Sequence, residues 1–180
     1  MIKYETQSVV RSANLLGLVL LLVLVTLLAA VVALVIWLFV DLPQVGQTLA
    51  AGVGYASDTL KSWQSFGLAM ILLVQISIWI AVIYRGRQIF TALTEVALND
   101  ASTAAGQTAR LLWILLVWGI VGHMLATVVA TWHFPEGTRA LGVDVGSTEI
   151  STLIAALLAT FTSRAFVLGA ALWQDHQGVV

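Results

Sequence analysis

Three polar side chains inside otherwise apolar stretches are the main candidates for chemistry: Gln75, His123 and Arg164. An amide, an imidazole and a guanidinium can bind an anionic head group, a quinone carbonyl or an acidic side chain of a partner. From the helical rise, each lies about 13–18 Å from the same end of its apolar stretch. If all three face inward, they form one polar cluster. Ionisable groups at such positions are often functional.

A structural role for the same residues is the alternative. Arg164 can extend its long side chain to the membrane surface, His123 can bond a neighbouring backbone or hydroxyl group, and Gln75 can pair between helices. In this structural role the three residues bind no ligand.

Metal, cofactor and catalytic sites are not expected. His133 lies ten positions after His123 and about 15 Å further along the same helix, and His176 is in the C-terminal tail. The chain has no cysteine, and its carboxylates all fall outside or at the edges of the apolar stretches. No histidine–carboxylate pair accompanies a nucleophile, so we do not expect an enzyme.

Four long apolar runs contain the candidate residues. They cover residues 15–40, 63–84, 111–132 and 150–173, and each is long enough to cross a bilayer as a helix. With 60% hydrophobic and 9% charged residues, the chain has too little polar surface for a water-soluble globule. We expect an all-α integral membrane four-helix bundle, with residues 1–180 in a single transmembrane domain.

The basic residues predict the orientation. One side of the membrane would carry Lys3, Arg11, Arg85, Arg87 and Arg110, and the other Lys61 and Arg139. The positive-inside rule therefore places both termini in the cytoplasm. A net charge of −1 gives no basic surface for nucleic acid.

The segments between the runs differ in character. Residues 88–98 have apolar side chains at helical spacing, and Asn99 and Asp100 are typical N-cap residues. We expect a cytoplasmic helical hairpin near residues 85–110. The loop near residues 41–62, with its glycines, is expected to be flexible.

Small residues recur at four-residue intervals in the last two runs. Gly122, Ala126 and Ala130 form one stripe, and Ala155, Ala159 and Ser163 form another. Such stripes let helix backbones approach closely. We expect these two helices to pack on each other, or the stripes to contact a partner subunit.

Two segments resemble a known family. Residues Asn99–Leu111 are similar to the start of the third span, and Phe166–Asp175 to the ending, of the bacterial membrane proteins grouped as domain of unknown function 2975. The resemblance implies a four-span protein of the bacterial inner membrane, sometimes encoded beside a small helix-turn-helix regulator. It implies no activity and no catalytic residue.

The sequence favours a non-enzymatic membrane protein that works by interaction, as an accessory or modulatory subunit of a membrane complex. Its expected partners are membrane lipids and another membrane protein, or further copies of itself. The alternatives are a small transporter or channel subunit, and a lipid- or quinone-binding anchor, both using Gln75, His123 and Arg164.

Overall fold

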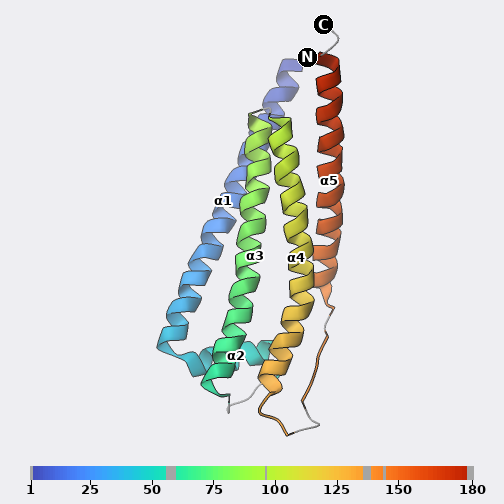
Figure 1. Ribbon diagram of the computed structural model, residues 1–180. Coiled ribbons are helices and arrows are strands. Elements are labelled where there is room, and N and C mark those ends of the chain that lie inside the picture. The colour runs from blue at the N-terminus through green and yellow to red at the C-terminus, as the bar shows by residue number, and fades with distance from the viewer. Residues whose placement is uncertain (1, 56–59, 96, 136–138, 144, 178–180) are drawn as a thin grey trace. The chain divides into compact units, whose positions relative to one another are not determined.

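The fold is all-α. In the computed structural model the described residues, 2–55, 60–95, 97–135, 139–143 and 145–177, form five helices and no strand. The helices are α1 (Ile2–Val40), α2 (Leu42–Gly52), α3 (Ser62–Thr94), α4 (Leu98–Thr131) and α5 (Ser147–Gln177), as labelled in Figure 1. The predicted all-α class is therefore confirmed.

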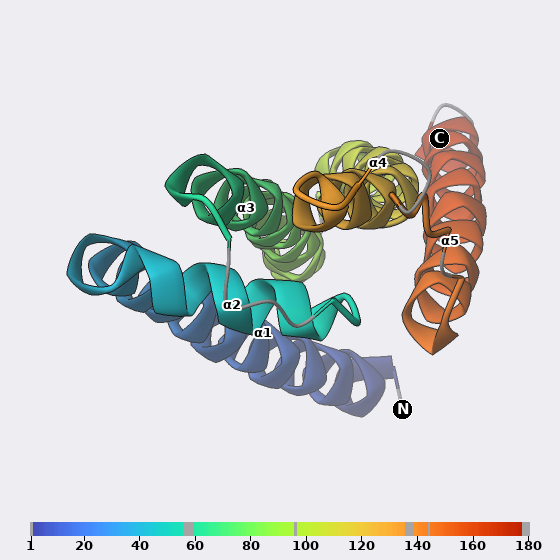
Figure 2. The same ribbon diagram turned by 90° about the horizontal axis from the view of Figure 1, so that it is seen from below.

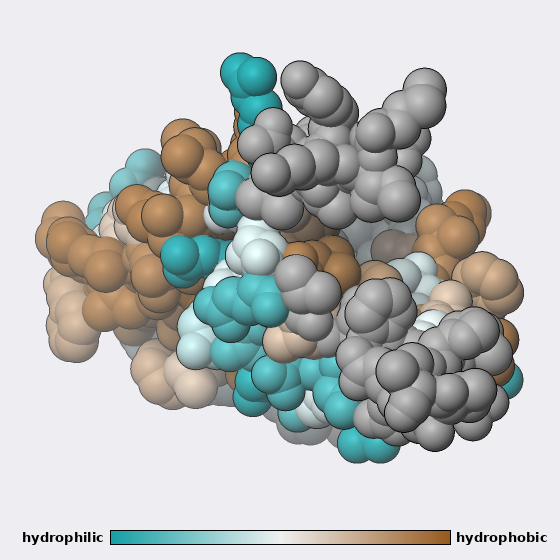
Figure 3. Space-filling view, turned by 90° about the horizontal axis from the view of Figure 1, so that it is seen from above, coloured by the Kyte–Doolittle hydropathy of each residue, from teal (hydrophilic) through white to brown (hydrophobic). Residues whose placement is uncertain are grey.

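Four of the helices are long and apolar enough to cross a membrane. The candidate spans are Arg11–Val40, Ser62–Thr94, Asn99–Thr131 and Ser147–Gly169. In the tested window of each span, between 6% and 28% of the residues are buried. Many large apolar side chains therefore lie at the surface, as the brown atoms of Figure 3 show. Such a surface suits lipid tails rather than water.

Contacts divide the chain into two compact units. The first unit comprises Met1–Thr26, Ile80–Trp113 and Thr152–Val180, and the second comprises Leu27–Trp79 and Ile114–Ser151. Each of the four long helices contributes to both units. The single domain over residues 1–180 stays a prediction.

Helix α2, in the second unit, replaces the flexible loop expected near residues 41–62. Asp41 caps its start, accepting a hydrogen bond from the backbone N–H of Gln44 at 3.0 Å, and Pro43 occupies the first turn. These are ordinary helix-start residues, because the carboxylate satisfies a free amide and proline needs no donor there. The helix runs crosswise to α3 and α4 (Figures 1 and 2). Residues 42–52 therefore form a helix where a loop was expected.

The buried face of α2 packs on the neighbouring helices of the same unit. Val45 clusters with Leu34 of α1 and Ala69 of α3. Gly46 lies so close to α3 that an added Cβ would collide with the side chain of Ser65 and approach its Cα to 2.9 Å. A glycine is therefore required here by contact, not by flexibility.

The first predicted small-residue stripe lies on the face of α4 that contacts α3 and α2. Ala126 and Ala130 are buried with Leu68 of α3 and Ala50 of α2. A Cβ on Gly122 would lie 3.4 Å from Ile71 of α3. Within the second unit, this stripe thus packs α4 against α3 and α2.

In the first unit, α3 and α4 form a helical hairpin. Helix α3 continues to Thr94, and α4 begins at Leu98, one residue before the cap expected at Asn99. The carbonyl of Asn99 instead accepts hydrogen bonds from the hydroxyl groups of Ser102 and Thr103. Val96, inside the expected hairpin, lies outside the described residues.

Helix α5 contacts the first part of α4 in the same unit. A Cβ on Gly106 would lie 3.2 Å from the hydroxyl of Ser163, and the indole of Trp113 donates to the hydroxyl of Thr160 at 3.3 Å. Ala156 of α5 is fully buried, whereas Ala155 is exposed and Ala159 half-buried. Ser163 of the predicted stripe therefore lies against α4, whereas Ala155 lies at the surface.

Candidate functional site

The three predicted cluster residues fall in two different units. Gln75 of α3 and His123 of α4 belong to the second unit, and both are half-buried. Arg164 of α5 belongs to the first unit and is exposed. Within the described chain, no hydrogen bond joins any of these three side chains to another. The cluster therefore stays a prediction.

The surroundings of Arg164 agree with a residue near a membrane surface. Its neighbour Ser163 lies against Gly106, in the part of α4 that precedes Arg110 and the apolar run. That part of α4 carries hydroxyl, amide and charged side chains. A long arginine side chain beside it can reach water.

His123 lies against a chain segment that follows α4. A Cβ on Gly142 would lie 3.8 Å from Nε2 of His123 and 3.2 Å from the hydroxyl of Thr127. The N–H of Ala140 donates to the hydroxyl of Thr131 at 3.3 Å. Residues 140–142 thus run along α4 and cover its last turns.

A buried polar network that sequence reasoning missed joins α3 and α4 in the second unit. Gln64 is fully buried; its amide donates to the carbonyl of Val129 at 2.7 Å and lies 3.4 Å from Nδ1 of His133. Its side-chain oxygen accepts from the N–H of Lys61 at 2.9 Å. The signal was a glutamine at the third residue of the helix, three positions after Lys61, where it can cap the first turn.

Aromatic side chains surround this network. Trp63 and Trp132 meet edge to face with ring centroids 6.2 Å apart, and the guanidinium of Arg139 lies 4.9 Å from the Trp132 ring centre. Tryptophan and arginine at a helix end are typical of a membrane–water interface. We interpret the network as structural, since its polar groups are satisfied by one another.

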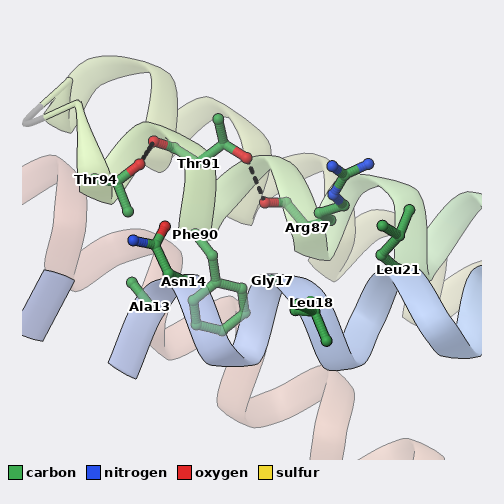
Figure 4. A pocket seen from close by; sticks show the side chains of 9 residues that line it. All are labelled: Ala13, Asn14, Gly17, Leu18, Leu21, Arg87, Phe90, Thr91 and Thr94. Carbon is green, nitrogen blue, oxygen red and sulfur yellow. Dashed lines mark hydrogen bonds between the residues drawn. The ribbon is translucent and has the colours of Figure 1, made fainter. Parts of the chain in front are cut away.

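A groove between α1 and α3, in the first unit, is a better candidate for binding (Figure 4). Its volume is about 280 Å³. The residues that line it are Ala13, Asn14, Gly17, Leu18 and Leu21 of α1 and Arg87, Phe90, Thr91 and Thr94 of α3. Polar and apolar side chains are therefore combined in one cavity at the start of the first apolar run.

Glycine helps to open this groove. A Cβ on Gly17 would meet no heavy atom within 4 Å, so a side chain there has room to extend. Figure 4 shows the ring of Phe90 reaching from α3 toward this part of α1. Gly17 is one of two interruptions of the first apolar run, but a single glycine in a span does not reveal what lies opposite it.

A second cavity lies between α3 and α4 in the same unit. Arg85, Gln107, Arg110 and Leu111 line it, and its volume is about 240 Å³. Arg85 donates to the side-chain oxygen of Gln88 at 2.8 Å and lies 5.9 Å from the Tyr84 ring centre. No carboxylate among the described residues forms an ion pair with Arg85 or Arg110.

Among the described residues, no group of three or more histidine, cysteine, aspartate or glutamate side chains could hold a metal ion. Comparisons of the sequence and the fold with protein-family models, curated proteins and solved structures give no match.

Proposed function

We propose that this chain is a non-enzymatic membrane protein that acts by binding another membrane protein, as an accessory or modulatory subunit of a complex. The observation that carries this proposal is the free face of α5. Ala155 and Thr162 are exposed and Ala159 is half-buried, whereas Thr160 and Ser163 contact Trp113 and Gly106 of α4. At about 100° per residue, Ala155, Ala159 and Thr162 share one side of the helix.

Small residues on a free helix face favour association in a membrane. Lipid tails are as apolar as leucine, so burial of apolar surface gives little gain there, and close backbone packing becomes the main attraction. A face of alanine and threonine permits that approach. The occupant is another membrane protein, or a second copy of this chain.

Purification from the native membrane tests this proposal. The full chain carries a C-terminal tag, and mass spectrometry identifies the proteins that accompany it in a mild detergent. We expect a partner in fixed proportion, or a homo-oligomer, and we expect Ala159→Leu to reduce its recovery at least fivefold. The matched control is Leu157→Phe, which also adds bulk at an exposed position but on the opposite side of α5.

A monomer that carries no partner from native membranes would contradict the proposal. Equal recovery with Ala159→Leu and Leu157→Phe would contradict the assignment to this face. The thermal unfolding temperature of each variant is measured in detergent. This measurement separates a loss of the partner from a loss of structure.

A small transporter or channel subunit is the second candidate. Gln75 and His123 favour it, because both are half-buried in one unit without a side-chain hydrogen bond among the described residues. The chain contains no cysteine, so cysteine can be introduced at positions 75, 123 and 164 individually. Reaction with a water-soluble thiol reagent would support a polar path, and protection at all three positions would exclude one.

The proposed setting is the bacterial inner membrane, with both termini in the cytoplasm. The basic residues at the ends of the apolar runs support the orientation. The resemblance to domain of unknown function 2975 supports the bacterial setting.

A further inference from the structure

The groove between α1 and α3 carries polar side chains at both of its ends. Asn14 and Thr94 lie at one end in Figure 4, and Arg87 and Leu21 lie at the other, with Phe90 between them. Asn14 immediately precedes the first apolar run, which begins at Leu15. The end at Asn14 is thus nearer to the predicted membrane surface than the end at Arg87 and Leu21.

The hydrogen-bond donors left for a ligand in this groove are those of Arg87 and Asn14. The hydroxyl of Thr91 donates to the carbonyl of Arg87 at 3.2 Å, and the hydroxyl of Thr94 donates to the carbonyl of Thr91 at 2.7 Å. Both threonine protons are therefore used within α3. The side chains of Arg87 and Asn14 form no hydrogen bond with another described residue.

Among the described residues, no carboxylate compensates the charge of Arg87. The lining contains no carboxylate, and no described aspartate or glutamate lies within ion-pair distance of the guanidinium. The side chain is half-buried, so water compensates its charge only in part. Guanidinium groups bind phosphate through paired N–H donors, and an unpaired arginine in a groove favours such an anion.

We propose that this groove binds an anionic phospholipid, with the lipid phosphate on Arg87, the head-group substituent toward Asn14, and the acyl chains leaving the groove past Leu21. The combination of one cation, one free amide and an apolar floor matches the order of groups in a glycerophospholipid. A volume of about 280 Å³ accommodates a head group and leaves the acyl chains on the open surface. Basic pockets between membrane helices commonly bind anionic lipids.

Native mass spectrometry of the purified full chain tests the site. The protein is exchanged into detergent with equal amounts of phosphatidylglycerol and phosphatidylcholine, and the bound lipids are counted. We expect one retained phosphatidylglycerol and little phosphatidylcholine. Removal of one arginine charge, in Arg87→Gln, should weaken retention about fivefold, and Arg87→Lys should keep most of it.

A steric variant tests the groove independently of charge. Gly17→Leu places a side chain in the open space and should prevent retention of the lipid. The matched control is Gly169→Leu, because Gly169 is also helical and open but lies on α5, away from the groove residues. Arg11→Gln is the charge control, since Arg11 is exposed on α1 and does not line the groove.

Three results would overturn the proposal. Equal retention of the two lipids would exclude recognition of the anionic head group. Retention unchanged in both Gly17→Leu and Arg87→Gln would show that the lipid binds elsewhere on the surface. Displacement by millimolar inorganic phosphate would assign the site to a soluble phosphate compound instead of a lipid. The assignment does not depend on whether a protein partner binds α5.

Discussion

At the scale of single residues, the space beside two glycines determines how neighbouring helices meet. Gly46 permits contact between α2 and α3, and Gly17 leaves a groove open between α1 and α3. Gly46 has no space for a side chain, whereas Gly17 has open space beside it. The first glycine is needed for helix contact, and the second leaves a groove. A substitution at each position therefore has a distinct expected effect.

Gly46→Ala should destabilise the protein. The added Cβ would meet the side chain and the Cα of Ser65, and the Cα cannot move without shifting α3. Overpacking of this kind costs about 1–3 kcal/mol. Thermal unfolding in detergent measures the effect. Gly52→Ala is the control, since it meets open space and should leave the unfolding temperature unchanged or slightly raised.

Gln64→Leu should also destabilise the protein, for an electrostatic reason. The change leaves the N–H of Lys61 without its acceptor and removes the donor to the carbonyl of Val129. An unsatisfied buried polar group costs about 1–3 kcal/mol. Gln44→Leu, at an exposed position on α2, is the comparison and should have little effect. Equal unfolding temperatures for the two variants would contradict a stabilising role of the network.

At the scale of elements, α2 depends on its cap. The helix is short, and short helices are marginal without tertiary contacts and satisfied ends. Its buried residues Val45 and Ala50 join two clusters of the second unit. Loss of order in α2 would therefore expose parts of α1, α3 and α4 as well.

Asp41→Ala should weaken this helix by about 1 kcal/mol, because the N–H of Gln44 loses its acceptor. Asp41→Asn keeps a side-chain oxygen and should retain most of the stability. Hydrogen exchange of the backbone amides in residues 42–52 measures the difference. Equal protection in the two variants would contradict the capping role.

At the scale of the whole molecule, the orientation in the membrane is the property that decides where each site acts. The cysteine-free chain allows single-cysteine labelling with a membrane-impermeant reagent. Cysteine at Thr103, exposed in the hairpin, should react only after the membrane is opened, whereas cysteine at Thr48, exposed on α2, should react in intact cells. The reverse pattern would place both termini outside the cytoplasm.

The sequence by itself determined the membrane-spanning helices, because long apolar runs without charges have no other stable environment. It also indicated the α3–α4 hairpin, since apolar periodicity continues past Tyr84. The sequence also indicated, in part, which side chains share one face of a helix. The stripe at Gly122, Ala126 and Ala130 follows from helical spacing alone.

The tertiary structure decided which surfaces meet. Spacing places Ala126 on a face of α4, but the contact with Leu68 and Ala50 depends on where α2 and α3 lie. The same is true of Gly46, where a glycine that is usual in loops lies in a helix because Ser65 occupies the space of a side chain. The groove at Gly17 and Arg87 likewise joins residues far apart in the chain. Local periodicity fixes the direction of a side chain on its own helix, whereas a site requires two helices whose relative placement depends on packing over the whole contact.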